Sequence, residues 1–162
     1  MLYKFLQTIL LLVISLAVNA QSLKSWTWDY YKMKFKAPDN MVVRKSDATV
    51  FEASNNSITM DIYPRKGENL TYDGMKNAAI KWAEQLSLSY NKNDGSTRQP
   101  IYLEDLNGYW GCAIDGTKDG FYASILLLVD PDYPEFSFYI WISYAREYYH
   151  DVLAVLRSFT PM

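Results

Sequence analysis

Apolar residues gather in long runs between residues 101 and 144, and turn-forming residues separate these runs. Asn107-Gly108 is the strongest turn signal, because a type I′ hairpin needs two residues that tolerate positive φ. Further turns are expected at residues 117–120 and 130–135, where Asp, Gly and Pro occur. This pattern predicts four antiparallel strands that pair in chain order and form the centre of the fold.

Alternation along these strands assigns their side chains to two faces. The hairpin pairs expected across the first turn are Leu106 with Tyr109, Leu103 with Cys112, and Ile101 with Ile114. The apolar face is then expected to continue through Ala123, Ile125, Leu127, Val129, Phe138, Ile140 and Ile142. The opposite face is expected to hold Tyr102, Glu104, Tyr109, Gly111, Ala113, Tyr122, Ser124, Tyr139, Trp141 and Ser143, with Leu126 and Leu128 among them. A one-residue slip in the second turn would exchange the faces of the last two strands.

Four shorter strands are predicted before residue 64. They are placed at residues 31–36, 41–45, 49–53 and 57–63. In the last of them Ile58, Met60 and Ile62 alternate with more polar residues, which is typical of a strand with one buried and one wetter side. Pro64 is expected to end this strand, because proline has no N–H to donate to a sheet.

Two segments have the periodicity of an amphipathic helix. Residues 73–88 repeat apolar side chains at spacings of three and four, and Thr71 precedes them as a cap. Trp82 is expected to anchor this helix on the sheet. Residues 146–158 form the second predicted helix, which has one apolar stripe. Between the first helix and the hairpin, residues 91–100 predict an exposed loop.

These elements predict an α+β fold in which an antiparallel sheet of about six to eight strands is flanked by two helices in an α/β/α sandwich-like arrangement. Residues 21–162 have the length of a single domain.

Residues 1–20 have the pattern of a secretory signal peptide, since Lys4 precedes an apolar stretch and Val18-Asn19-Ala20 offers small residues for cleavage. The apolar stretch is shorter than the ~20 residues that a spanning helix needs. We therefore expect a periplasmic or secreted protein with no membrane span after cleavage.

Charge and residue counts argue against several function classes. The formal net charge is −2 and the basic residues form no stripe, so no nucleic-acid partner is expected. Cys112 is the single cysteine, and its neighbours Gly111 and Ala113 indicate a small buried strand residue rather than a reactive thiol. His150 is the single histidine, so no common zinc or copper spacing is present and neither metal nor cofactor is expected.

Aromatic residues make up 16% of the chain, and they suggest a binding face. Aromatic side chains on a sheet either stack on flat ligands and anchor partners, or form core under a helix. Most carboxylates fall at turns, but Glu104 is predicted in mid-strand on the aromatic face, where it would bind a hydroxyl, an amine or a cation, or lie in water at a sheet edge. The candidate ligand- or partner-binding residues are Tyr102, Glu104, Tyr109, Tyr139 and Trp141.

Several short motifs occur in a characteristic order along residues 21–162. They are Phe35-Lys36-Ala37-Pro38 at the end of a strand, Phe51 in a later strand, Trp82 in a helix, Leu106-Asn107-Gly108 at a hairpin, and Leu156-Arg157-Ser158-Phe159 after the last helix. In this order the chain resembles the PsbP-like superfamily of α/β/α sandwiches. The resemblance implies a non-enzymatic adaptor or accessory protein with an antiparallel sheet between helices, and it transfers no catalytic residue.

Together these observations predict an exported, non-enzymatic binding or accessory protein of the bacterial cell envelope, whose partner is an unknown protein or small ligand. The binding surface is expected on the aromatic face or on the loop at residues 91–100. Two alternatives stay open. One is a homodimeric structural subunit whose open sheet face is its own interface, and the other is a hydrolase that uses Glu104 with a tyrosine.

Overall fold

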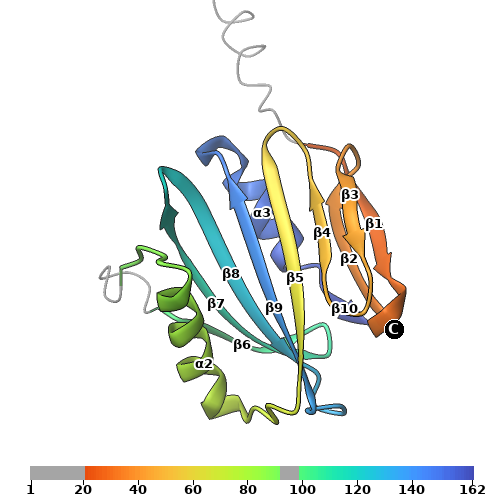
Figure 1. Cartoon of the computed structure of the whole chain (residues 1–162), viewed down its shortest axis with the longest axis vertical. Coiled ribbons are helices and arrows are strands. Elements are labelled where there is room, and N and C mark those ends of the chain that lie inside the picture. The colour runs from red at the N-terminus through yellow and green to blue at the C-terminus, as the bar shows by residue number, and fades with distance from the viewer. Residues whose placement is uncertain (1–20, 92–98) are drawn as a thin grey trace, which may run out of the picture.

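The computed structural model describes residues 21–91 and 99–162 (Figure 1). The expected leader at residues 1–20 and most of the expected loop at residues 91–100 lie outside the described residues. The elements in chain order are β1 (Leu23–Trp28), η1 (Asp29–Tyr31), β2 (Met33–Pro38), β3 (Val42–Ser46), β4 (Phe51–Ser54), β5 (Ile58–Lys66), α2 (Tyr72–Gln85), β6 (Ile101–Leu106), β7 (Tyr109–Lys118), β8 (Phe121–Val129), β9 (Phe136–Tyr144), η2 (Arg146–Tyr148), α3 (Tyr149–Leu156) and β10 (Thr160–Pro161).

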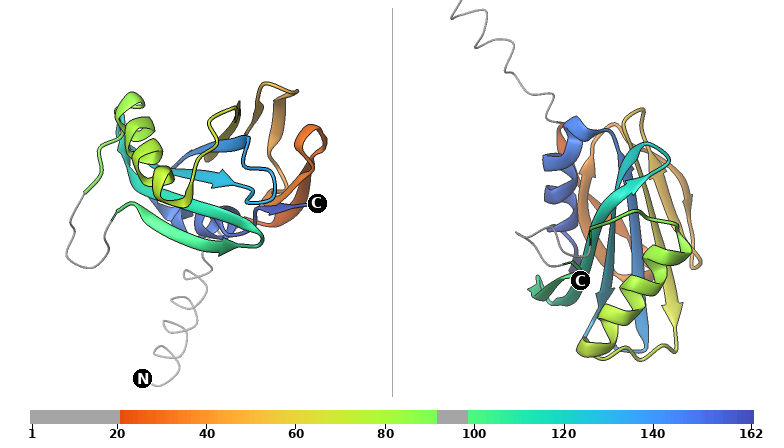
Figure 2. Two further views of the ribbon diagram at one scale, coloured as in Figure 1. Left: turned by 90° about the horizontal axis from the view of Figure 1, so that it is seen from below. Right: turned by 90° about the vertical axis from the view of Figure 1, so that its left-hand side faces the viewer.

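Two antiparallel sheets and two helices form the described part of the chain. The large sheet has seven strands in the order β3-β4-β5-β9-β8-β7-β6, and the small sheet has the order β1-β2-β10. Helix α2 lies on one face of the large sheet, whereas α3 and the small sheet lie on the other (Figure 1, Figure 2). The prediction of an α+β fold with an antiparallel sheet between helices is confirmed.

The four strands predicted in the second half of the chain are β6 to β9, and they pair in chain order. Asn107 and Gly108 have φ angles of 54° and 103°, which are the positive values that a type I′ turn requires. Leu106 pairs with Tyr109, as the sequence predicts. The dipeptide therefore fixes the hairpin by its own backbone preference.

Beyond this pair, the predicted register of the hairpin is wrong by one residue. Leu103 pairs with Gly111 rather than with Cys112, and Ile101 pairs with Ala113 rather than with Ile114. The cause is an irregularity in β6 at residues 104 and 105, where the bulged strand has one more residue than its partner.

The predicted apolar face is confirmed for β7 and β8 but wrong for β6, whose Ile101 and Leu103 pair with Ala113 and Gly111, and for β9. The face shared with Leu126 holds Phe138, Ile140 and Ile142. Trp141 instead lies opposite Ile125, on the face that carries α2. Strands β8 and β9 are central and largely apolar on both faces, so alternation gave no signal to fix the register after the second turn.

The four early strands are confirmed with shifted bounds, as β2, β3, β4 and β5. The expected end of β5 at Pro64 is wrong, because β5 continues to Lys66 beside β9. Strand β4 pairs with β5 only as far as Ile62, so Pro64 lies at a sheet edge, where proline is tolerated. Strand β1 and the two-residue β10 complete the small sheet, and the sequence pattern does not predict either of them.

Helix α2 forms one apolar layer with the β7 and β8 half of the large sheet. The side-chain oxygen of Thr71 accepts a hydrogen bond from the Gly74 N–H at 3.1 Å, which confirms the predicted cap. The buried residues of the helix are Met75, Ala79, Trp82 and Ala83. They pack over Cys112, whose thiol pKa is raised to about 12 by burial. The interpretation of Cys112 as a small buried strand residue is confirmed.

The layer on the opposite face is rich in aromatic rings. Phe35 stacks on Phe159 with ring centroids 5.2 Å apart and meets Phe51 edge-on at 5.3 Å. Val152, Val155 and Leu156 of α3 close this layer. The second predicted helix is therefore confirmed but shorter, because η2 forms its first turn. Within residues 21–91 and 99–162, no helix is long and apolar enough to cross a membrane.

The end of the chain is tied to the hairpin turn and to the small sheet. The side-chain amide of Asn107 donates to the carbonyl oxygens of Arg157 and Phe159, each at 2.9 Å. The N–H of Met162 donates to the carbonyl oxygen of Lys32 at 2.8 Å. These bonds bring β10 to the edge of β2 and place the last residues beside η1.

Candidate functional site

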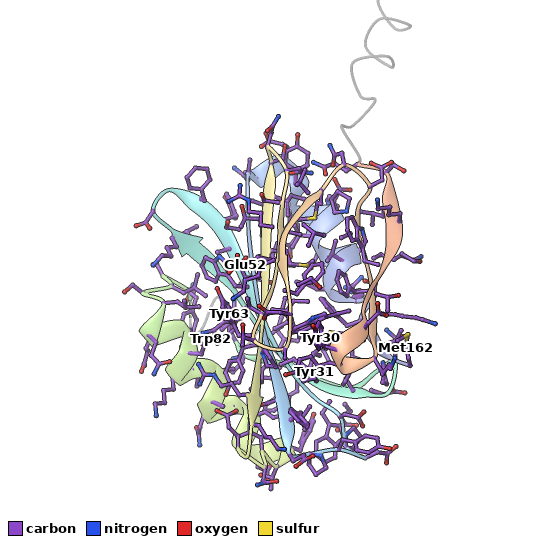
Figure 3. All side chains as sticks on the ribbon, turned by 45° about the vertical axis from the view of Figure 1, so that its right-hand side comes forward. Tyr30, Tyr31, Glu52, Tyr63, Trp82 and Met162 are labelled. Carbon is purple, nitrogen blue, oxygen red and sulfur yellow. The ribbon has the colours of Figure 1, made fainter. Side chains whose placement is uncertain are left out.

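Within residues 21–91 and 99–162, no helix covers one part of the α2-bearing face. Helix α2 packs on β7 and β8, whereas β9, β5 and β4 continue the same face beside the helix (Figure 2). We call this surface the open face, and its residues are Glu52, Thr59, Asp61, Tyr63, Trp141 and Ser143. In Figure 3 the labelled Glu52, Tyr63 and Trp82 follow one another from β4 across β5 to α2. The open face is thus a sheet surface bounded on one side by a helix.

Two carboxylates lie directly opposite each other on the open face. Glu52 of β4 and Asp61 of β5 form a cross-strand pair, and like charges in this arrangement destabilise a sheet. Burial raises the pKa of Asp61, the charge of Glu52 raises it further, and the Tyr63 hydroxyl and Arg44 partly offset both effects. In the described ranges, neither carboxylate has a Lys or Arg nitrogen within 4.0 Å. Lys45 of β3 lies opposite Glu52 in register, but its ammonium pairs with Asp47 at 3.4 Å, so the two carboxylates keep their negative charge without an ion pair in the described ranges.

The raised pKa of Asp61 predicts that its charge costs stability. A carboxyl group whose folded pKa exceeds its unfolded value contributes stability that falls as the pH rises from the ordinary pKa of 3.8 through the raised one. At pH 7 Asp61 is charged, so the wild-type protein carries the full cost of burying this charge beside Glu52. An Asp61→Asn variant has no charge at this position and avoids that cost. Urea unfolding should give a higher midpoint for the variant at pH 7, and the difference should vanish well below pH 3.8. A variant that is less stable at pH 7 would contradict the penalty.

Two aromatic rings flank the carboxylate pair. Tyr63 is 39% exposed, and its hydroxyl donates to Asp61 Oδ2 at 3.4 Å. Trp141 is half-buried and lies directly opposite Asp61 on β9. Carboxylates attract a cation by charge, and the face of a Trp or Tyr ring attracts it through its quadrupole. This combination suits a lysine or arginine side chain.

Tyr139, another sequence candidate, is a structural anchor. It is 2% exposed, and its hydroxyl donates to Glu68 Oε2 at 2.8 Å. Ser137 donates to the same oxygen, Trp82 meets the Tyr139 ring edge-on at 5.0 Å, and Arg65 lies 4.1 Å from the ring centroid. Burial and the bond to Glu68 raise the pKa of Tyr139. The residue holds the segment before α2 on the sheet.

Tyr102 and Glu104 lie far from Trp141, on the edge strand β6. Strands β7 and β8 separate β6 from β9. The Tyr102 ring packs 5.0 Å from the Tyr72 ring at the start of α2. Glu104 is exposed within the irregular part of β6, so it is not on a shared face with the open-face rings.

Tyr109 lies on the opposite face of the large sheet from Trp141 and Tyr139. It is 2% exposed, and its ring lies 6.3 Å from that of Phe138. Burial, and then the charge of Asp130, raise the pKa of Tyr109. The structure therefore does not bring the five candidate residues together in one site. Trp141 lies on the open face, Tyr139 is core, two residues are at an edge, and Tyr109 lines a separate cleft.

This cleft lies where the small sheet, η1, the β8–β9 connection and the end of the chain meet. We call it the aromatic cleft; it has a volume of about 320 Å³ and is lined by Tyr30, Tyr31, Lys32, Tyr109, Asp130, Tyr133, Phe136, Phe138, Pro161 and Met162. Figure 3 shows the labelled Tyr30, Tyr31 and Met162 away from the open-face labels, on the side of the small sheet. The described part of the chain thus presents two separate candidate surfaces, the open face and the aromatic cleft.

Sequence reasoning missed most residues of both surfaces. Tyr30 lies just before a predicted strand and Tyr133 lies in a predicted turn, so neither was expected at a binding site. Large exposed rings in such segments were the one available signal for the cleft. Glu52 and Asp61 belong to separate short strands, and their pairing depends on the register between β4 and β5.

Groups suited to metal binding do not gather in the described part of the chain. No three His, Cys, Asp or Glu side chains within residues 21–91 and 99–162 are placed to hold a metal ion. His150 is exposed at the start of α3, where its ring lies 5.6 Å from Tyr149. The chemistry of both surfaces is that of aromatic rings, hydroxyls and single charges.

Comparison with solved structures finds this fold elsewhere. The Ran-binding protein Mog1p of Saccharomyces cerevisiae aligns with a TM-score of 0.57 and 11% sequence identity, over 86% of this chain and 95% of that chain. A Bacteroides thetaiotaomicron protein aligns with a TM-score of 0.46 and 11% identity over 88% of this chain, which spans 49% of that chain. No protein-family model and no curated protein sequence matches this chain. The chain shares the fold of Mog1p, and this likeness supports the PsbP-like fold that the order of elements implies.

Proposed function

We propose that this chain is an exported, non-enzymatic binding or accessory protein of the bacterial cell envelope and a distant member of the PsbP-like superfamily. Its open face binds a basic segment of a protein partner. The observation that carries this proposal is the pair of Glu52 and Asp61 beside the rings of Tyr63 and Trp141. Export is supported by the leader pattern in residues 1–20.

The charge arrangement of the open face favours a cationic partner. Because Glu52 and Asp61 repel each other, a lysine or arginine placed between them gains attraction from both and relieves their repulsion. Interfaces with complementary charge bind faster and select their partners. A negative surface whose charge costs stability is more readily explained by binding than by folding.

The shape of the open face favours a protein segment over a small molecule. The surface crosses β4, β5 and β9 beside α2, and small ligands are usually enclosed in concave pockets rather than on such an area. Tyr63 and Trp141 are also the residue types that anchor protein interfaces. The same fold occurs in Mog1p, whose name describes it as Ran-binding, so this architecture is compatible with a protein-binding role.

The two alternatives from the sequence have less support. In a symmetric homodimer whose twofold axis passes near Glu52 and Asp61, each copy would place these carboxylates against those of the other, and the four charges would repel. A hydrolase that uses Glu104 needs this carboxylate in a pocket that excludes water, but Glu104 is exposed on an edge strand. Light scattering on the purified protein tests the first alternative by its mass.

A peptide titration tests the proposed function. The probe is a short fluorescein-labelled peptide of alternating lysine and glycine, and binding is followed by fluorescence anisotropy at low salt. We expect a Glu52→Gln/Asp61→Asn double variant to bind about tenfold more weakly, and the wild-type affinity to fall as salt is added. The variant keeps the size of both side chains, so its fold is expected to persist.

The matched control removes the same charge elsewhere. A Glu104→Gln/Asp105→Asn variant alters two exposed carboxylates on β6. The Gly108 N–H donates to Asp105 at 3.0 Å, and the amide oxygen of the introduced asparagine can still accept this bond. We expect this control to bind the peptide within about twofold of the wild type. Equal losses in both variants would assign binding to net charge alone, and no binding by the wild type would also contradict the proposal.

A further inference from the structure

The aromatic cleft has the size and shape of a small-molecule site, and it lies away from the proposed partner surface. Its volume of about 320 Å³ is at the lower end of the range for ligand pockets. Six of its lining residues are aromatic, namely Tyr30, Tyr31, Tyr109, Tyr133, Phe136 and Phe138. They come from η1, β7, the β8–β9 connection and β9, so the site exists only in the folded chain.

The floor of the cleft is rigid. The Tyr31 hydroxyl donates to the carbonyl oxygen of Ala48 at 2.6 Å, and the Tyr31 ring lies 5.6 Å from Phe136 and 5.3 Å from Phe138. Tyr109 is almost fully buried beneath them. A ligand that enters this cleft meets rings that are already held in place, which lowers the entropic cost of binding.

The rim of the cleft is formed by rings that contribute little to the core. Tyr30 is 62% exposed and Tyr133 is 67% exposed. They belong to η1 and to the β8–β9 connection, and both line the cleft. Tyrosines of this kind offer an apolar ring face together with a hydroxyl, which matches a ligand with an apolar face and a polar perimeter.

The two charges at the cleft select a neutral ligand. Lys32 offers a donor and Asp130 an acceptor, so a ligand with a single charge is attracted by one of them and repelled by the other and gains little from its charge. A sugar ring avoids this conflict, because its C–H faces stack on aromatic rings and its hydroxyls both donate and accept. We infer that the aromatic cleft binds a neutral carbohydrate of one or two rings, stacked on the exposed rings of Tyr30 and Tyr133 with hydroxyls directed to Lys32 and Asp130.

Calorimetric titration with cellobiose, maltose and N,N′-diacetylchitobiose tests this inference. The sugars are used up to about 10 mM, which detects millimolar affinity. We expect at least one of them to bind, and Tyr133→Ala to weaken that binding about tenfold. Asp130→Asn should weaken it severalfold without disturbing the turn, because asparagine can still accept the bond that Asp132 N–H makes to Asp130 at 2.9 Å.

The control variant is Phe121→Ala, which removes an aromatic ring that is 60% exposed and lies outside the cleft lining. Its sugar affinity should equal that of the wild type. The inference is overturned if none of the three sugars binds, if Tyr133→Ala and Phe121→Ala weaken binding equally, or if indole binds in the cleft while the sugars do not. None of these outcomes depends on the open face, so the proposed function is tested separately.

Discussion

Replacing Trp28 with alanine is expected to lower the free energy of unfolding by about 3–5 kcal/mol. Trp28 is fully buried at the end of β1, and its ring lies 4.7 Å from Tyr31, 6.1 Å from Phe51 and 6.4 Å from Phe138. Its indole N–H donates to the carbonyl oxygen of Asp47 at 3.1 Å, so the variant also leaves this acceptor without its donor. Urea unfolding followed by circular dichroism measures the loss.

The matched control for Trp28 is Trp26 on the same strand. Trp26 is only partly buried, and one face of its ring is covered by the Lys24 ammonium at 4.3 Å. We expect Trp26→Ala to lower the free energy of unfolding by less than about 2 kcal/mol, because folding buries less of the Trp26 ring than of the Trp28 ring. If the two variants lost equal stability, the small sheet would not be joined to the main core through Trp28.

Gly116→Ala is expected to destabilise the protein by about 3 kcal/mol. The backbone of residue 89 lies against β7 here, where Ser89 and Thr117 exchange two backbone hydrogen bonds of 2.9 and 2.8 Å. A Cβ on residue 116 would overlap the Ser89 carbonyl oxygen and meet Leu88 at 3.0 Å. Because the overlapping atom belongs to the backbone, the overlap can be removed only if the segment after α2 moves away from the sheet.

The same substitution at Gly74 serves as the control for Gly116. Gly74 lies in the first turn of α2, and a Cβ there meets the Thr71 side-chain oxygen at 3.2 Å. Alanine favours a helix over glycine by up to about 1 kcal/mol, so Gly74→Ala should change stability by no more than that amount. A Gly116→Ala protein as stable as the Gly74→Ala protein would show that the segment after α2 yields without cost.

The sequence predicted the elements that local signals specify. Asn107-Gly108 predicted the hairpin turn because both residues tolerate positive φ, and Thr71 predicted the start of α2 because its oxygen can accept a backbone N–H. Local signals also placed most strands. They failed for β10, whose two residues are too few for any periodic pattern, and for Pro64, whose tolerance depends on where β4 ends.

The candidate binding residues were less predictable, because a binding face depends on which strands become neighbours. Trp141 was found by its residue type and does lie on a partly uncovered surface. Tyr139 has the same alternation but is core, since α2 and Glu68 cover it. Tyr109 keeps its predicted face within β7, but Tyr139 and Trp141 lie on the opposite face, because the register of β9 after the second turn differs by one residue from the predicted one.

The sequence by itself determined the α+β class, the four-strand meander and both helices, because turn preferences and hydrophobic periodicity act over a few neighbouring residues. The tertiary structure alone decided the pairing of Glu52 with Asp61 and the placement of Tyr30 and Tyr133 at one cleft. Both surfaces join residues far apart in the chain. Their geometry follows from strand order and register, which the packing of the whole core fixes and no short segment encodes.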